Sequence, residues 1–215
     1  MRHPARLPLE ALQPYLLPLP SPQADSSAPH YDWAHVFGNA NPVEIEVGFG
    51  KGLFLLNSAQ ARPAVNFVGV EIERKYQLFA ATRIAKRGLG NVRLACADAR
   101  TFLRDRVADT TVQAVHVYFP DPWWKTRHHK RRVFTEDFAG QCVRTLAPGG
   151  HLQLATDVED YYERVTEMLA GIESLRLLRP PADHEPAHDL DYLTNFERKF
   201  RKEGKPIFRA TYERP

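Results

Sequence analysis

Val43-Glu44-Ile45-Glu46-Val47-Gly48-Phe49-Gly50-Lys51-Gly52 is typical of a buried strand that runs into a glycine turn and then a helix. In such a turn, a ligand can approach the backbone at the N-terminus of the helix. A dinucleotide-binding turn would need a glycine at Leu53, three residues after Gly50. Because the glycines here alternate behind Glu46, the pattern favours a methyl-donor site over a nicotinamide site.

Strand-length and helix-length segments alternate along the rest of the chain. We expect strands near 43–47, 66–71, 92–96, 113–119, 151–155, 175–179 and 206–212. We expect helices over 51–61, 73–87, 135–146 and 159–170, with Pro148-Gly149-Gly150 closing the helix before the fifth strand. This order predicts an α/β fold with a mostly parallel seven-stranded sheet and helices on both faces.

The first forty residues have a different composition. They contain Pro4, Pro8, Pro14, Pro18, Pro20, Pro22 and Pro29. Proline removes a backbone donor and fixes φ, so this segment is expected to sustain neither helix nor sheet. The predicted organisation is a proline-rich arm over 1–40 and a folded domain over 41–215.

Length, charge and cysteine content exclude several classes of protein. The chain has 215 residues, a net charge of +3 and two cysteines, Cys96 and Cys142. A general polycation, a disulfide framework and a zinc site are therefore not expected. The two cysteines favour a reducing cytosol, so we expect a cytoplasmic protein without a metal. No run of about 18 apolar residues is present, so we expect no membrane partner.

Acidic residues lie within, at the end of or shortly after four successive predicted strands. Glu46 lies within the first, Glu71 ends the second, Asp98 follows the third and Asp121 follows the fourth. The carboxyl ends of parallel strands share one edge of the sheet, where ligands of open α/β folds bind. A carboxylate such as Glu71 can accept hydrogen bonds from both hydroxyls of a ribose. Each acid alone is also compatible with a turn or cap residue.

A proline- and tryptophan-rich loop surrounds Asp121. Phe119-Pro120-Asp121-Pro122-Trp123-Trp124 is expected to hold Phe119 and Asp121 extended, because each precedes a proline. The two tryptophans offer stacking surface to a base. The cations that follow can neutralise phosphates, and they are Lys125, Arg127, Lys130, Arg131 and Arg132. The alternative is a solvated charge run after a buried aromatic turn.

The motifs together resemble those of the bacterial tRNA (guanine-N7-)-methyltransferases over about residues 43–213. The matching segments are Glu46–Gly52, Phe67–Glu71, Phe119–Arg132, Ala155–Asp157 and Thr194–Glu197. The resemblance implies a class I methyltransferase (Rossmann-like) fold, S-adenosylmethionine as methyl donor, and guanosine 46 of the tRNA variable loop as acceptor. Trp124, where the family more often has proline or histidine, and Val47, in place of a usual isoleucine, depart from the pattern.

The resemblance also implies roles for single residues. Glu46, Glu71, Asp98 and Asp121 would bind the donor together with Gly48, Gly50 and Gly52, and Asp121 would also be catalytic. Lys125, Asp157, Thr194, Asn195 and Glu197 would contact the substrate, and we add Arg127, Arg131 and Arg132 from the basic run. Glu197 is also compatible with a salt-bridged surface acid, because Arg198 and Lys199 follow it.

The chemistry of guanine N7 fits these residues. N7 carries a lone pair and no proton, so the transfer needs alignment and a suitable field, with no general base. Asp121 could stabilise the positive charge that reaches the purine, or accept from the N–H edge of the base. We expect a monomer or a homodimer.

Two other classes of protein remain open from the sequence. An adenine or cytosine amino-methyltransferase usually has Asp/Asn-Pro-Pro-aromatic order, whereas this loop has Pro-Asp-Pro-Trp. A non-catalytic RNA-binding module would keep the basic run but would have no use for acids around a glycine turn.

Overall fold

The computed structural model describes residues 7–19, 29–121, 133–178 and 194–215. The chain divides into two compact units, Met1–Val107 and Ala108–Pro215. Lys125, Arg127, Arg131 and Arg132 lie outside the described residues.

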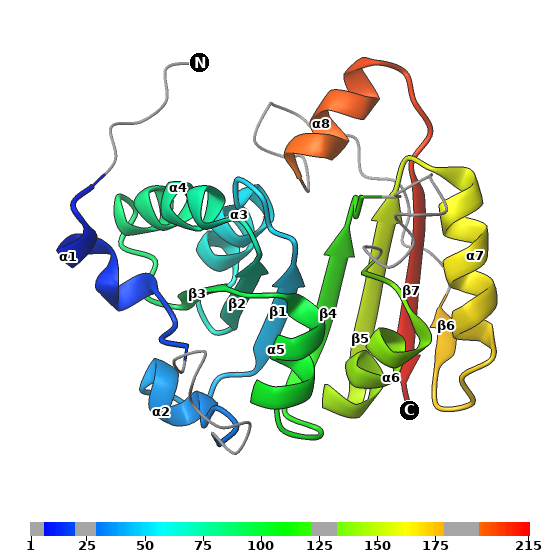
Figure 1. Cartoon of the computed structure of the whole chain (residues 1–215), viewed down its shortest axis with the longest axis horizontal. Helices are drawn as coiled ribbons and strands as arrows, with labels where there is room; N and C mark the ends of the chain where they lie inside the picture. Colours follow the sequence, from blue (N-terminus) through cyan, green and yellow to red (C-terminus); the bar gives the residue numbers. More distant parts are fainter. Residues whose placement is uncertain (1–6, 20–28, 122–132, 179–193) are drawn as a thin grey trace. The chain divides into compact units, whose positions relative to one another are not determined.

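The first unit contains three parallel strands and their connecting helices (Figure 1). Strand β2 (Asn66–Glu71) lies between β1 (Val43–Val47) and β3 (Val92–Cys96). The helices are α3 (Leu53–Ala61), α4 (Arg74–Ala85) and α5 (Ala99–Arg106), and all three pack against β2. Every residue of β1 and β2 is buried, including the polar residues of both strands.

Two acids nevertheless lie within β1. Glu44 is 7% exposed, and its carboxylate accepts two hydrogen bonds from the Arg62 guanidinium, at 2.6 and 2.9 Å. Glu46, on the same side of the strand's alternation, is 3% exposed. A buried carboxylate needs such a partner. The groups that surround Glu46 therefore decide whether its carboxylate is paired within the protein or available to a ligand.

The described part of the N-terminal forty residues is folded, in contrast to the predicted extended arm. It forms α1 (Leu9–Leu12), the 3-10 helix η1 (Gln13–Tyr15) and α2 (Trp33–Phe37). Pro8 occupies the N-cap of α1 and Pro14 the start of η1, where the missing N–H has no partner to lose. Helix formation is therefore compatible with these prolines. The division into an arm over 1–40 and a domain over 41–215 stays a prediction.

Apolar contacts hold this segment against the first unit. Leu12 and Leu17 are buried, and the Leu17 N–H donates to the Leu94 carbonyl of β3 at 2.9 Å. The Tyr31 ring stacks between Trp33, at 5.3 Å, and Phe102 of α5, at 5.9 Å. Leu12, Leu17, Trp33 and Phe37 are thus part of the first unit's core.

The second unit contains four strands in the order β4-β5-β7-β6. Strand β4 (Val112–Tyr118) is parallel to β5 (Leu146–Thr156), whereas β7 (Phe208–Arg214) is antiparallel to both β5 and β6 (Arg176–Leu178). The helices are α6 (Glu136–Thr145), α7 (Glu159–Ala170) and α8 (Asn195–Lys202). Figure 1 shows α7 alongside the strands of this unit and α8 beyond the arrowhead of β4.

Three local features differ from the sequence prediction. Helices α5 and α8 are additional; each has eight residues and only a few apolar side chains, with Phe196 and Phe200 one turn apart on α8. Strand β5 begins at Leu146 and includes Pro148-Gly149-Gly150, which was expected to precede it. Gly149 has a φ of 75°, and a Cβ on Gly150 would lie 2.8 Å from the Ala147 carbonyl oxygen, so the glycines allow an irregular start to this strand.

Candidate donor and substrate sites

The glycine turn after β1 has left-handed backbone at each of its glycines. Gly48, Gly50 and Gly52 have φ values of 71°, 51° and 67°. A Cβ on Gly52 would lie 2.9 Å from that of Ala80, whereas Cβ atoms on Gly48 and Gly50 would meet nothing within 4 Å. The backbone between β1 and α3 is therefore open to a ligand at Gly48 and Gly50.

Glu71 connects the end of β2 to this turn. Its Oε2 accepts from the Gly50 N–H at 3.0 Å, and its Oε1 accepts from the Glu73 N–H at 3.0 Å. The side chain is buried, with 8% of the residue exposed. Because each carboxylate oxygen has two acceptor sites, both oxygens keep capacity for further donors such as hydroxyls.

Glu46 contributes a second buried carboxyl group. The Leu55 N–H in the first turn of α3 donates to it, but Oε2 has no hydrogen-bond partner among the described residues. Burial raises the pKa of Glu46 well above its ordinary value, and the neighbouring Glu71 carboxylate raises the pKa further. A buried acidic oxygen without a partner suits a ligand that brings a cation or a hydrogen-bond donor.

Asp98 begins α5 at the carboxyl end of β3. Its carboxylate caps the helix by accepting from the Arg100 N–H at 2.9 Å, and the Arg100 guanidinium binds both of its oxygens. The Arg100 side chain holds the pKa of Asp98 below its ordinary value, although partial burial opposes this effect. Asp98 is thus an ionised, partly exposed group at the strand end.

Sequence reasoning missed Ile72, which follows Glu71 directly. Ile72 is 67% exposed, the largest exposure among the described large apolar residues. Its carbonyl accepts from the Cys96 thiol at the end of β3, at 3.5 Å. The sequence signal for Ile72 is an apolar residue directly after a strand-end acid. At that position, an exposed apolar side chain can pack against a flat ring of a ligand.

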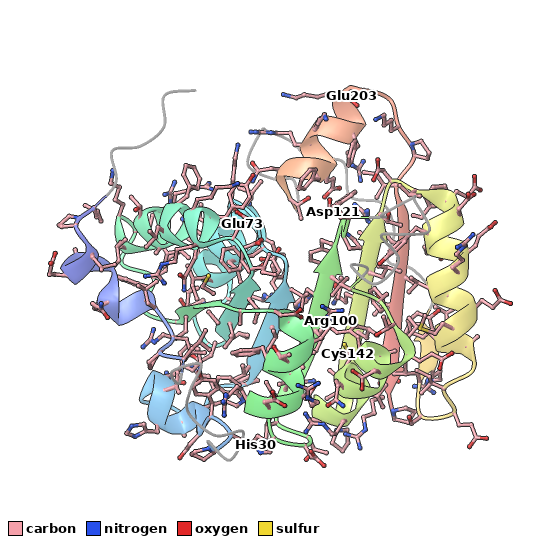
Figure 2. All side chains as sticks on the ribbon, viewed as in Figure 1. His30, Glu73, Arg100, Asp121, Cys142 and Glu203 are labelled. Atoms are coloured by element: carbon pink, nitrogen blue, oxygen red, sulfur yellow. The ribbon has the colours of Figure 1, made fainter. Side chains whose placement is uncertain are left out.

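In the second unit, Asp121 follows β4 and is exposed (Figure 2). The prediction that Phe119 is extended is wrong, since Phe119 has a φ of 51°. Its N–H donates to the Ala155 carbonyl of β5 at 2.7 Å. Asp157 comes directly after β5, and Tyr118 and Ala155 are register partners, so Asp121 and Asp157 follow neighbouring parallel strands.

Helix α8 carries the remaining candidate substrate residues. The Thr194 hydroxyl caps the helix by accepting from the Glu197 N–H at 3.0 Å, and Asn195 is the first helical residue. Glu197 is 3% exposed, and its carboxylate accepts from Arg201, at 3.0 Å, and from Arg209 of β7. Glu197 is therefore a buried ion-paired group, whose substrate contact stays a prediction.

The structure thus places the candidate residues in two groups. The first unit brings together Glu46, Glu71 and the glycine turn, with Asp98 at the end of the neighbouring strand. The second unit holds Asp121, Asp157 and α8. No cluster of metal-ligating side chains occurs in the part of the chain that the structure describes. Among these residues, no helix is both long and apolar enough to cross a membrane.

Comparison with solved structures confirms the predicted fold class. The 16S rRNA methyltransferase KamB aligns with 86% of this chain and 95% of its own, with a TM-score of 0.58 and 16% identity. The aminoglycoside resistance methyltransferase NpmB1 covers 81% of this chain and 87% of its own, with a TM-score of 0.53 and 16% identity. The chain therefore has the class I methyltransferase fold, a seven-stranded mostly parallel sheet with helices.

Sequence comparisons identify the family. A family model described as "Putative methyltransferase" matches residues 40–210. The tRNA (guanine-N(7)-)-methyltransferase of Rhodopirellula baltica is 45% identical over 185 residues, 83% of this chain and 68% of the relative. The tRNA (guanine-N(7)-)-methyltransferase of Geobacter metallireducens is 36% identical over 185 residues, 85% of this chain and 87% of the relative. The resemblance seen in the motifs is thereby confirmed, and the chain belongs to the tRNA (guanine-N(7)-)-methyltransferase family.

Proposed function

We propose that this protein transfers the methyl group of S-adenosylmethionine to N7 of guanosine 46 in the tRNA variable loop. The observation that carries the proposal is the hydrogen bond between Glu71 and the Gly50 N–H, beside the unpartnered Oε2 of Glu46. This hydrogen bond joins the carboxylate at the end of β2 to the open glycine turn after β1, in a chain of the tRNA (guanine-N(7)-)-methyltransferase family. The membership of the family supports guanine N7 of tRNA as the acceptor.

The residues of the first unit fit the proposed donor. S-adenosylmethionine carries an ammonium group, a sulfonium group, a ribose with two hydroxyls and a flat adenine. Glu71 would accept from the ribose hydroxyls, and Glu46 would satisfy its free oxygen with the cationic part of the donor. The exposed Ile72 would cover a face of the adenine, and Asp98 would accept from its polar edge.

When bound, the donor supplies an electrophilic methyl group on a sulfonium. The protein's own part in the transfer is alignment and electrostatics, because guanine N7 has a lone pair and no proton to lose. Positive charge reaches the purine as the methyl group moves. The Asp121 carboxylate would either stabilise that charge or hold the N–H edge of the base.

The tRNA would be bound by the second unit and by the basic run. Lys125, Arg127, Arg131 and Arg132 would neutralise phosphates. Asp157, Thr194, Asn195 and Glu197 would contact the target nucleoside, with Glu197 acting from its buried position at the start of α8. With tRNA as its partner, the enzyme would work in the cytoplasm, as a monomer or a homodimer.

Identification of the methylated nucleoside tests the function. The purified protein is incubated with isotopically labelled S-adenosylmethionine and a tRNA transcript, and the nucleosides are separated by chromatography with mass detection. We expect labelled 7-methylguanosine. The matched control is the same transcript with adenosine at position 46, which should remain unlabelled.

Other products would contradict the proposal in distinct ways. A methyl group on an exocyclic nitrogen of adenine or cytosine would support the amino-methyltransferase alternative. Label in the control transcript at another guanine would retain N7 chemistry but reject position 46. Tight tRNA binding without donor binding in calorimetry would indicate an RNA-binding module.

A further inference from the structure

Phe119 has a backbone conformation that its sequence context disfavours. A residue before proline prefers extended backbone, and residues other than glycine rarely adopt positive φ. Phe119 nevertheless precedes Pro120 and has a φ of 51°. Such strain persists only where the surroundings enforce it, and it concentrates at functional sites. The surroundings of Phe119 therefore hold it in this conformation.

Three aromatic rings meet at the end of β4. The buried Phe119 ring lies 5.5 Å from that of Phe200 and 6.2 Å from that of Phe196, measured between centroids. Phe196 and Phe200 are one helical turn apart on α8, and their rings stack at 6.1 Å with an angle of 24°. The turn that carries Asp121 is thus packed directly against α8.

A second connection between the turn at Phe119 and α8 runs through β5 and β7. The Phe119 N–H donates to the carbonyl of Ala155, and Ala155 is the register partner of Arg209 on β7. Arg209 binds the carboxylate of Glu197, which is at the start of α8. The backbone of Phe119 is therefore connected through β5 and β7 to the helix that its ring contacts.

We propose that Phe119 is a positioning residue, whose ring packs against α8 and thereby sets the direction in which Pro120 and Asp121 leave β4. The proposal rests on the proposed function, in which Asp121 acts on the guanine during methyl transfer. Only Pro120 lies between Phe119 and Asp121, so a change in the packing of the ring displaces the carboxylate. The packing of Phe119 against α8 then determines both where α8 lies relative to β4 and which way the Asp121 side chain points.

Three substitutions at Phe119 separate the ring from the backbone. Phe119→Asn tolerates positive φ but lacks the ring, Phe119→Gly relieves the strain and lacks the ring, and Phe119→Tyr keeps an aromatic ring. We expect kcat to fall about 10- to 100-fold in the asparagine and glycine variants, as for a small misplacement of a reacting group. KM for the donor should change less than about threefold, and Phe119→Tyr should restore most of kcat.

Phe138→Leu is the matched control. Phe138 is a fully buried ring of α6 that packs edge-to-face against Phe134 at 5.3 Å. We expect a lower melting temperature and an unchanged kcat for this variant. If kcat of the Phe119 variants merely follows their loss of stability, as judged against Phe138→Leu, the positioning role is rejected.

Amide hydrogen exchange tests the connection without measuring activity. Phe200→Leu should accelerate exchange in the peptide containing Phe119 and Asp121, and Phe138→Leu should not. Unchanged exchange in Phe200→Leu overturns the proposal, as does a kcat within twofold of wild type in Phe119→Asn. If the wild-type enzyme makes no 7-methylguanosine, the proposed function fails, and the exchange result still decides whether α8 holds the turn.

Discussion

The carboxylate of Glu71 accepts a hydrogen bond from the backbone N–H of Gly50 at 3.0 Å. The contact links the end of β2 to the glycine turn after β1. It shapes the turn before any ligand arrives, and it leaves acceptor capacity on the same carboxylate. Glu71 should therefore influence both the local backbone and the binding of the donor.

Glu71→Ala should weaken S-adenosylmethionine binding by about 10- to 150-fold, the equivalent of about 1.5–3 kcal/mol for lost charge-assisted hydrogen bonds. Binding of tRNA should change little. Calorimetry with each ligand measures both effects. Glu73→Ala is the control, since the exposed Glu73 side chain pairs with Lys75 and should leave donor affinity unchanged. A folded Glu71→Ala protein with wild-type donor affinity would remove Glu71 from the site.

Glu46→Gln should have opposite effects on stability and binding. The pKa of Glu46 is raised in the folded state, so the folded protein holds a proton that the unfolded chain releases above the ordinary carboxyl pKa. The stability that the protonated Glu46 side chain contributes is thus lost as pH rises through its raised pKa. At neutral pH, glutamine should raise the melting temperature of the unliganded protein, and this gain should vanish below the ordinary carboxyl pKa.

Donor binding should weaken in Glu46→Gln, because the carboxylate would no longer receive the cationic donor. Glu44→Gln provides the contrast on the same strand, since Glu44 is paired with Arg62 and its loss should lower the melting temperature. Thermal melts with and without S-adenosylmethionine measure these changes. If Glu46→Gln and Glu44→Gln change the melting temperature and the donor affinity in the same way, Glu46 is not a donor-binding group.

Asp121→Ala should slow methyl transfer by about 10²–10³-fold, the usual effect of removing one preorganised electrostatic group. Single-turnover rates at saturating donor and tRNA are the measurement, and they should stay level from about pH 6.5 to 8.5 because N7 has no proton to lose. Asp109→Ala is the control, since Asp109 is exposed and pairs with Arg144. If Asp121→Ala reacts within a few-fold of the wild-type rate, Asp121 is not the catalytic group, and stacking of the base on Trp123 or Trp124 would have to account for the rate.

Asp121→Asn distinguishes the two possible roles of the carboxylate. If its charge stabilises the methylated purine, asparagine should resemble alanine. If it accepts a hydrogen bond from the base, asparagine should retain more of the rate. The comparison uses the same single-turnover assay.

The double substitution Arg131→Ala, Arg132→Ala should flatten the dependence of log tRNA affinity on log salt by about one to two units. Donor affinity should not change. Arg176→Ala is the control for loss of a surface arginine, because Arg176 forms an exposed ion pair with Glu213. A slope equal to that of wild type would assign both arginines to roles other than phosphate binding.

The sequence predicted the strands and their acids more accurately than the loops. Strand-length segments of mostly apolar residues, interrupted by Glu44 and Glu46 in β1, identify β1 and β2, and alternating glycines identify the turn. Both patterns follow from local sterics and burial. The helix α8 was missed, since its stability depends on Thr194, on the buried Glu197 ion pairs and on rings distant in sequence. The φ of Phe119 was predicted wrongly for a similar reason: tertiary contacts override the preference of a residue before proline.

The Leu17 N–H that binds the Leu94 carbonyl has a consequence for solubility. Strand β3 is an edge strand of the sheet, and exposed backbone at a sheet edge can recruit another chain. The short parallel bridge between Leu16 and Leu94, with Leu17 buried next to it, covers part of this edge. Residues 16 and 17 therefore occupy backbone groups of β3 that would otherwise be available to a strand of another chain, and we expect their removal to expose this edge to intermolecular pairing.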